Sequence, residues 1–245
     1  MVVNENELRA VIGCMEFVFG SEKFIEVNRN HVIFLIGMYG KFVSAVVQTS
    51  PGGLGYDAAE LKTVRAIEAV NPSIVISVGV AFGKDEKSQQ LGDVIVAEMV
   101  NDYTHQRQGK DGDVRIRNPQ PPVSRRLYGI FKNDLGWSLE RATNDVCKVI
   151  KGPIVSGPHL VDNLEYKKKL FERFPDAKGG EMEGAAILSA CETGSKPDGI
   201  IIKAICDWGD GNKQKDWQPF AAHAAASYVL HHLKKRGTYE EFTTM

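Results

Sequence analysis

The sequence lacks the cysteine and histidine spacings that define metal sites and disulfide frameworks. Its 245 residues include four cysteines, none of them in a Cys-x-x-Cys or Cys/His pattern: Cys14, Cys147, Cys191 and Cys206. At least Cys191 and Cys206 lie in apolar runs, which is typical of reduced core residues. We therefore expect no metal site and no cofactor.

Long apolar runs and a surplus of one charge are also missing. No apolar stretch reaches the roughly 18 residues that a membrane span needs. Residues 1–7 are polar and acidic, unlike a secretory leader. The formal net charge of −1 gives no general attraction to nucleic acid or to a membrane surface. We expect a cytoplasmic protein whose partner is a small molecule, with no nucleic acid and no membrane.

Domain linkers and internal repeats are absent as well. With 43% apolar residues, the chain is long enough to bury one sizeable core, so we expect a single α/β domain over residues 1–245.

Apolar patterning predicts strands that alternate with helices. The β-branched runs at 32–37 and 42–47, joined by a short link that contains Gly40, predict a hairpin. Further strands are expected at 73–79, at 91–98 and before residue 157, and helices before Asn71-Pro72, at 124–135 and from 217 to 233. Residues 8–20 fit either a helix or a strand and turn.

The polar stretch 105–126 carries six basic residues against two acidic ones: Arg107, Lys110, Arg115, Arg117, Arg125 and Arg126 against Asp111 and Asp113. One interpretation is a solvated loop. The other is an electropositive lid over the 5′ phosphates of a nucleotide, because arginine matches phosphate with paired hydrogen bonds.

Two acids flank a methionine where a short strand is expected to meet a helix. In an extended segment the side chains of Glu181 and Glu183 point the same way, and Met182 points the other way or lies on the cleft floor. Such a pair suits a ligand with several hydroxyl groups. The alternative is that both acids belong to the first turn of the helix, where the helix dipole favours negative charge.

A further acid ends a near-continuous apolar run at residues 200–206. Such a run is typical of a buried parallel strand, and Asp207 then lies at its carboxyl end, where open α/β sheets place their ligands. Partial burial raises a carboxyl pKa, so Asp207 is a candidate proton donor near neutral pH.

The Glu181-Met182-Glu183 motif followed by Asp207 resembles the paired signature of the nucleoside phosphorylase and nucleosidase superfamily. Separate matches occur in the expected order at 78–83, 91–94, 155–157 and 217–220. The chain is most similar, from about 32 to 233, to the 5′-methylthioadenosine/S-adenosylhomocysteine nucleosidase branch. The resemblance implies a three-layer α/β/α fold with a central mixed, mostly parallel twisted sheet, and a homodimer.

The resemblance also implies roles in cleaving the bond between a purine, of the adenine type, and ribose. Asp207 would protonate the leaving base, and Glu183, assisted by Glu181, would hold the ribose and stabilise its developing positive charge. Met182 would lie against the sugar. The family's water-activating acid ends its first strand, and Glu16 is the nearest candidate here, shifted by about two positions.

The resemblance implies that three further residues contact the purine base or another part of the ligand. Leu160 stands where the family usually has an aromatic wall for the purine, main-chain groups near Val161 would read the base edge, and Trp217 would contact the ligand.

Ser77 and Val80 bear on the choice of nucleophile. Phosphorylases of the superfamily hold phosphate with an arginine near position 77 and a hydroxyl residue near position 80, and this sequence has neither. We therefore expect water as the nucleophile, with phosphorolysis as the alternative. Because nucleosidases usually keep a hydroxyl residue at the position of Val80, a nucleoside-binding or signalling module without catalysis is a further alternative.

Overall fold

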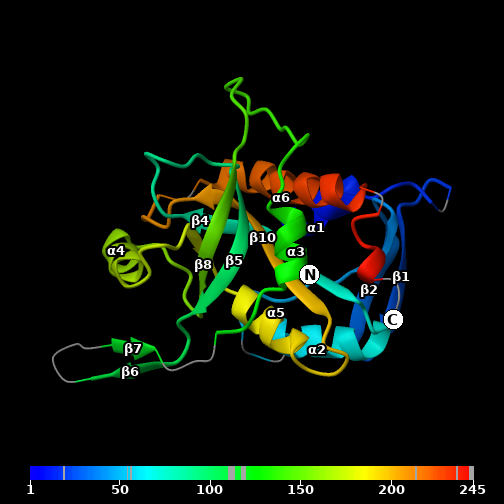
Figure 1. Ribbon diagram of the computed structural model, residues 1–245, viewed down its shortest axis with the longest axis horizontal. Coiled ribbons are helices and arrows are strands. Elements are labelled where there is room, and N and C mark those ends of the chain that lie inside the picture. The colour runs from blue at the N-terminus through cyan, green and yellow to red at the C-terminus, as the bar shows by residue number, and fades with distance from the viewer. Residues whose placement is uncertain are drawn as a thin grey trace.

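A computed structural model describes residues 1–18, 20–53, 55, 57–109, 114–116, 120–212, 214–235 and 237–242 (Figure 1). Its centre is a five-stranded barrel in the order β10-β4-β9-β8-β5. The strands are β4 (Ile74–Gly83), β5 (Val94–Asp102), β8 (Val149–Ser156), β9 (Gly179–Glu181) and β10 (Asp198–Asp207).

The sheet is mixed and mostly parallel, as predicted, but it is not an open sheet between two helix layers. β10 with β4, β5 with β8 and β8 with β9 are parallel, whereas β4 with β9 is antiparallel. Residues 202–204 of β10 also pair antiparallel with residues 94–96 of β5, and this short register closes the barrel.

The apolar run at the end of the chain forms β10, the strand predicted from residues 200–207. Its isoleucines are fully buried because the barrel interior covers one face and helices cover the other. Near its end the register with β4 shifts between Ile205 and Asp207. This irregularity sets the position of Asp207 opposite Phe82 of β4.

A second sheet contains β1 (Phe24–Arg29), β2 (Val32–Tyr39) and β3 (Phe42–Val46), all antiparallel. β2 and β3 are the predicted hairpin. Gly40 in its link has a φ of 65°, a left-handed conformation that glycine adopts without steric cost.

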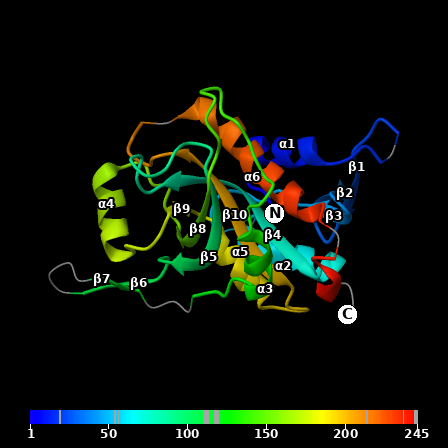
Figure 2. The ribbon, with the colours of Figure 1, turned by 45° about the horizontal axis from the view of Figure 1, so that its top comes forward.

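Six α-helices surround the strands in the described residues. They are α1 (Glu5–Cys14), α2 (Ala59–Val70), α3 (Arg125–Phe131), α4 (Leu164–Arg173), α5 (Gly184–Cys191) and α6 (Gln218–Leu233), with short 3₁₀ helices η2 (Lys215–Trp217) and η3 (Glu240–Phe242). α6 packs along β10 and β4, and α5 lies with α2 on the other side of the barrel (Figures 1 and 2). No helix within the described ranges has both the length and the apolar character to cross a membrane.

The polar stretch expected to be a loop contains an antiparallel hairpin of β6 (Gln106–Gln108) and β7 (Val114–Ile116). The hairpin extends away from the barrel (Figures 1 and 2). Lys110 and Arg117 lie outside the described residues, so the interpretation of this stretch as a phosphate lid stays a prediction.

A buried ion pair between Asp93 and Arg141 contributes to the stability of the barrel, and this contribution can be tested. Asp93, before β5, bonds the Arg141 guanidinium and accepts hydrogen bonds from the backbone N–H of Lys148 (2.8 Å) and Gln90 (2.9 Å). Removing Asp93 leaves Arg141 buried without its main partner. We predict that Asp93→Ala lowers the free energy of unfolding by about 3–5 kcal/mol in urea titrations. The control Asp145→Ala, which removes the solvent-exposed partner of the same arginine, should change it little. If the two substitutions lower the free energy of unfolding equally, the buried Asp93–Arg141 pair does not stabilise the fold more than the exposed Asp145–Arg141 pair does.

Candidate active site

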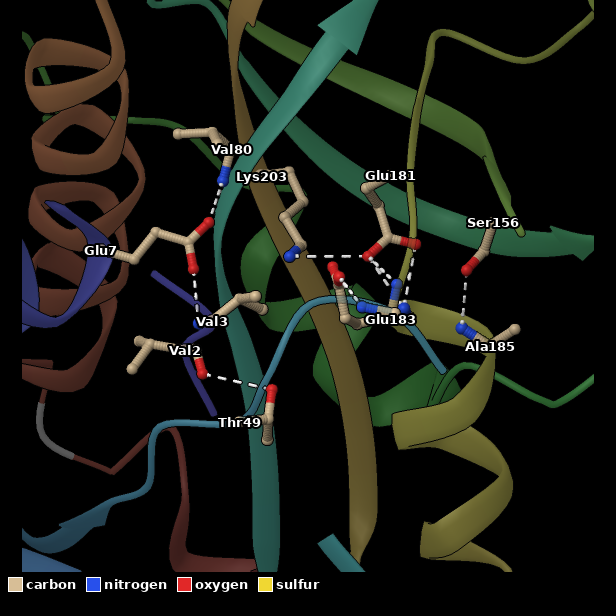
Figure 3. A network of polar contacts seen from close by, with 12 residues as sticks. Val2, Val3, Glu7, Thr49, Val80, Ser156, Glu181, Glu183, Ala185 and Lys203 are labelled. Atoms are coloured by element: carbon tan, nitrogen blue, oxygen red, sulfur yellow. Dashed lines mark hydrogen bonds and ion pairs between the residues drawn. The ribbon is translucent and has the colours of Figure 1, made fainter. Parts of the chain in front are cut away.

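A buried lysine lies at the centre of the candidate site. Lys203 is 1% exposed on β10, and its Nζ lies 3.5 Å from Glu181 Oε2. Burial by itself lowers the pKa of Lys203, but the carboxylates of Glu181, Glu7 and Glu183 outweigh it and raise the pKa above its ordinary value. In the view of Figure 3, Glu7 and Glu181 lie on opposite sides of the Lys203 ammonium.

Glu181 is held in place by the start of α5. Its carboxylate accepts hydrogen bonds from the backbone N–H of Glu183 (3.1 Å) and of Gly184 (2.9 and 2.8 Å). A β-carbon at position 184 would lie 2.8 Å from Glu181 Oε1, so a larger residue there would displace this carboxylate. Glu181 is the last residue of β9 and not part of the first turn of α5, as the alternative interpretation expected, but its carboxylate binds the N–H groups at the start of that helix and pairs with Lys203.

Glu183 begins the same helix but faces another segment. Its side chain is buried, and Oε1 accepts a hydrogen bond from the backbone N–H of Gly52 at 2.7 Å. Burial raises the pKa of Glu183 to about 7, Lys203 opposes this shift, and Glu181 adds to it. Glu183 is therefore able to change its protonation state near neutral pH.

Glu7 supplies the third carboxylate of the group. It is 3% exposed, and its Oε2 accepts hydrogen bonds from the backbone N–H of Val3 (2.6 Å) and Asn4 (3.3 Å), which completes a capping box at the start of α1. Oε1 accepts a hydrogen bond from the backbone N–H of Val80 at 2.9 Å (Figure 3). The carboxylate fills the space beside Gly79, where a β-carbon would overlap it.

Sequence reasoning missed Glu7 and proposed Glu16 for this position. Glu16 is exposed in the segment after α1, where its backbone N–H donates to the carbonyl of Met38 at 3.0 Å. The structure does not bring Glu16 to the other acids. The capping-box spacing of Asn4 and Glu7 was visible in the sequence, but that pattern indicates only the start of a helix.

Asp207 lies at the same end of the barrel strands. Its Oδ1 accepts a hydrogen bond from the Gly209 N–H (2.9 Å), and the Cys206 thiol donates to Oδ2 (3.3 Å). Burial raises the pKa of Asp207 above its ordinary value, and these two hydrogen bonds limit the shift. Asp207 pairs with Phe82, which pairs with Gly180, so two strand spacings, about 10 Å, separate the backbones of Asp207 and Gly180.

The other predicted site residues differ in how far they are buried and in what they contact. Val80 is half-buried next to Glu7. Val161 is buried beside the turn that follows Asp207, since a β-carbon at Gly209 would lie 3.1 Å from the Val161 carbonyl oxygen. Leu160 is 68% exposed. Trp217 stands edge-on to Phe220, with 5.6 Å between the ring centroids.

A cavity of about 410 Å³ opens beside the Glu-Met-Glu turn. Met182 lines it together with Gly53, the α5 residues Ala185, Ala186 and Ser189, and residues 120–122 and 156–158. Among the predicted site residues within the described ranges, Met182 alone lines this cavity. No group of three or more His, Cys, Asp or Glu in the described part of the chain is arranged to hold a metal ion.

Comparison with known proteins places the chain in a family. The profile of the Phosphorylase superfamily matches residues 5–232, so the chain belongs to that superfamily, as the sequence motifs predicted. A Death domain-containing ATP nucleosidase of Amphimedon queenslandica is 38% identical over 258 residues, which cover 95% of this chain and 47% of that protein. The chain thus spans about half the length of that relative.

Two further relatives are of similar length to this chain. A 5′-methylthioadenosine/S-adenosylhomocysteine nucleosidase of Staphylococcus haemolyticus is 29% identical over 225 residues, covering 89% of this chain and 93% of that one. The crystal structure of the nucleosidase with the same name from Neisseria meningitidis, in complex with methylthio-immucillin-A, has a TM-score of 0.77 at 22% identity and covers 95% of this chain and 97% of that one. This last similarity shows the fold.

The raised pKa of Glu183 predicts a pH-dependent cost to stability. In the unfolded chain Glu183 loses its proton near pH 4.5, whereas in the folded protein it does so near pH 7, so rising pH favours unfolding through this group across that window. Glu183→Gln removes the cost. Relative to the unmodified protein, its free energy of unfolding should increase by as much as about 3 kcal/mol from pH 4 to pH 8, measured by urea titration. If the difference in unfolding free energy between Glu183→Gln and the unmodified protein does not change with pH, the pKa of Glu183 is not raised in the folded protein.

Proposed function

We propose that the protein is a nucleosidase that hydrolyses the bond between an adenine-type purine and the ribose of a nucleoside or nucleotide. The observation that carries this proposal is the group of three buried carboxylates, Glu7, Glu181 and Glu183, around Lys203, with the half-buried Asp207 at the end of β10, the strand that carries Lys203. Cleavage of an N-glycosidic bond develops positive charge on the sugar and negative charge on the base. A site for it needs an acid for the base and anionic groups for the sugar.

Asp207 is the proton donor in this proposal. Its carboxyl has a raised pKa because it is partly buried, so more of it is protonated near neutral pH than of an ordinary aspartic acid. The Gly209 N–H and the Cys206 thiol fix its orientation. Protonation of the purine, at N7, turns the base into a neutral leaving group.

Glu183 holds the ribose hydroxyl groups and stabilises the cationic sugar. One of its oxygens is bound to Gly52, which fixes the carboxylate before the ligand arrives. Glu181 acts differently from Glu183, because its oxygens bind the start of α5 and Lys203. We assign Glu181 as a positioning residue, and Met182, on the cavity wall, as the contact to the sugar.

Glu7 takes the role that the sequence suggested for Glu16, the orientation of the attacking water. Its Oε1 bonds the Val80 N–H on β4, next to the lysine and the other two acids. A carboxylate in this position accepts a proton from water as the water attacks the sugar.

The same charges favour water over phosphate. Val80 offers only its backbone N–H, which Glu7 already occupies, and Ser77 is buried. Three carboxylates face one ammonium in this group, so an incoming phosphate anion would meet repulsion. Hydrolysis therefore fits better than phosphorolysis.

The proposed group at the 5′ position of the substrate rests on similarity to known proteins. The relative at 38% identity is named an ATP nucleosidase, and this supports an adenine nucleotide, with ATP as the first substrate to test. The methylthioadenosine and S-adenosylhomocysteine nucleosidases support thioether nucleosides as the next group.

A mass-spectrometric screen tests the activity. Incubation with ATP, ADP, AMP, adenosine, methylthioadenosine or S-adenosylhomocysteine should release free adenine at a rate that added phosphate does not change. Asp207→Asn, which cannot donate the proton, should lower kcat by about 100-fold or more. Full activity of Asp207→Asn would reject the mechanism. Binding of a nucleotide without release of adenine would instead select a module that has lost catalysis.

The two candidate water-activating acids give a matched pair of variants. Glu7→Gln should lower kcat by about 100-fold with a smaller change in KM, because it removes a group that acts in the chemical step. Glu16→Gln, on the exposed segment after α1, should keep kcat within about twofold. The reverse result would return the role to Glu16.

A further inference from the structure

One lysine faces inward on α4, a helix that lies apart from the other helices (Figures 1 and 2). The buried residues of α4 are Lys167, Leu170 and Phe171, which the helical period places on one face. Leu170 and Phe171 belong to an apolar cluster. Lys167 is 7% exposed, at a position where an amphipathic helix normally carries an apolar residue. Its neighbours explain why a lysine is placed there.

The ammonium group of this lysine lies against the tryptophan that follows the proposed proton donor. Lys167 Nζ is 5.7 Å from the centroid of the Trp208 ring, within the roughly 6 Å of a cation–π contact. Trp208 is buried, and its ring fills the space beside Gly83, where a β-carbon would lie 2.5 Å from it. Because Asp207 and Trp208 are consecutive, this contact holds the chain at the end of β10.

The same helix also contacts the residue opposite the donor. Asp207 pairs with Phe82 on β4. The Phe82 ring lies edge-on to the ring of Phe171 on α4, with 6.0 Å between the centroids. α4 therefore contacts both neighbours of Asp207, one across the sheet and one along the chain. The fit of α4 bears directly on where the Asp207 carboxyl group lies.

Charge links Lys167 to the donor as well. Burial lowers the pKa of Lys167, and four carboxylates oppose this shift, which are in order of effect Asp210, Glu86, Asp207 and Asp85. An interaction between two charges is mutual. The Lys167 ammonium therefore favours the charged form of Asp207.

The other groups around Asp207 act in both directions. Burial raises the pKa of Asp207, the Cys206 thiol and the Gly209 N–H lower it, and the carboxylates of Asp162 and Asp210 raise it. The Lys167 ammonium opposes the effect of these two carboxylates. A neutral residue at position 167 would leave their repulsion without this counterweight.

The next lysine on α4 is engaged elsewhere. Lys167, Lys168 and Trp208 line one cavity of about 500 Å³. Lys168 pairs with Glu165 at 3.0 Å, and its side chain is 56% exposed. Four acidic and three basic residues line this cavity, so a bound anion does not account for Lys167. Lys168 has the same charge on the same helix and serves as a matched control.

We propose that Lys167 is a positioning residue for the proton donor: its ammonium holds Trp208 in place and stabilises the carboxylate that Asp207 becomes when its proton passes to the purine. This inference rests on the proposed function. In the step concerned, the O–H bond of Asp207 breaks, the proton binds N7 of the base, and the electron pair stays on the carboxylate. Lys167 keeps its own proton. A cation beside the donor makes it a stronger acid, so the transfer is easier.

The first measurement needs no enzymatic activity. It is an NMR titration of the aspartate side-chain carboxyl carbons in the full chain, with the Asp207 resonance assigned by its loss in Asp207→Asn. Lys167→Met keeps an unbranched apolar side chain and removes the charge, so it should raise the pKa of Asp207 by about 0.5 or more. Lys167→Gln, a second neutral variant, should raise it as well. Lys167→Arg and the control Lys168→Met should keep it within about 0.2 of the unmodified protein.

The second measurement is the pH profile of kcat for adenine release from ATP. Lys167→Met should lower the plateau by about fivefold or more with KM within about twofold, because the charge acts in the chemical step. Activity falls at high pH as the donor loses its proton, and this limb should shift to higher pH because the pKa of Asp207 is raised. Lys167→Arg should restore both the plateau and the limb. A substitution that only loosened α4 would lower the plateau and leave the limb in place.

The outcomes separate this role from the proposed function. An unchanged pKa of Asp207 in both neutral variants, a lower kcat without a shift of the limb, or an equal effect of Lys168→Met would overturn the role of Lys167. Any of these results together with adenine release by the unmodified protein would leave the proposed function intact. Failure of the unmodified protein to release adenine would reject the proposed function, and the NMR titration would still decide whether Lys167 acts on Asp207.

Discussion

The attraction between the Lys203 ammonium and three carboxylates is the interaction on which the rest of the structure depends. The carboxylates come from α1, from the end of β9 and from the start of α5, segments far apart in the sequence. All four groups are buried, and a buried charge left without a partner costs several kcal/mol, so the Lys203 ammonium depends on the carboxylates around it. The group therefore ties the first helix, the barrel and α5 together.

This constraint also explains how the site keeps its charges in fixed positions. Each carboxylate accepts hydrogen bonds from backbone N–H groups: Glu7 from Val3 and Val80, Glu183 from Gly52, and Glu181 from Gly184. Backbone donors do not change rotamer, so the oxygens need little rearrangement when a ligand binds. Gly79 and Gly184 are part of the same arrangement because their missing β-carbons leave room for the carboxylates.

Much of the fold and part of the site followed from patterns in the sequence. The β2–β3 hairpin, β10 and α6 were predicted because periodicity and turn residues are local signals. Barrel closure was not, since it rests on a short pairing of β10 with β5 that no local pattern encodes. Glu7 was missed because its burial depends on β4 and Lys203, which only the tertiary structure brings to it. Lys203 had a usable signal: a lysine inside an isoleucine-rich strand is seldom fully buried unless it is paired.

The most direct test of the central claim, that Asp207 and the Lys203 group act on one ligand, is a crystal structure of the protein with a non-hydrolysable adenine nucleoside analogue. The account predicts one bound molecule, with Asp207 within hydrogen-bond distance of the purine N7 and Glu183 within hydrogen-bond distance of the ribose hydroxyl groups. An analogue bound with Asp207 and Glu183 in contact with separate molecules, or with neither residue in contact, would contradict it.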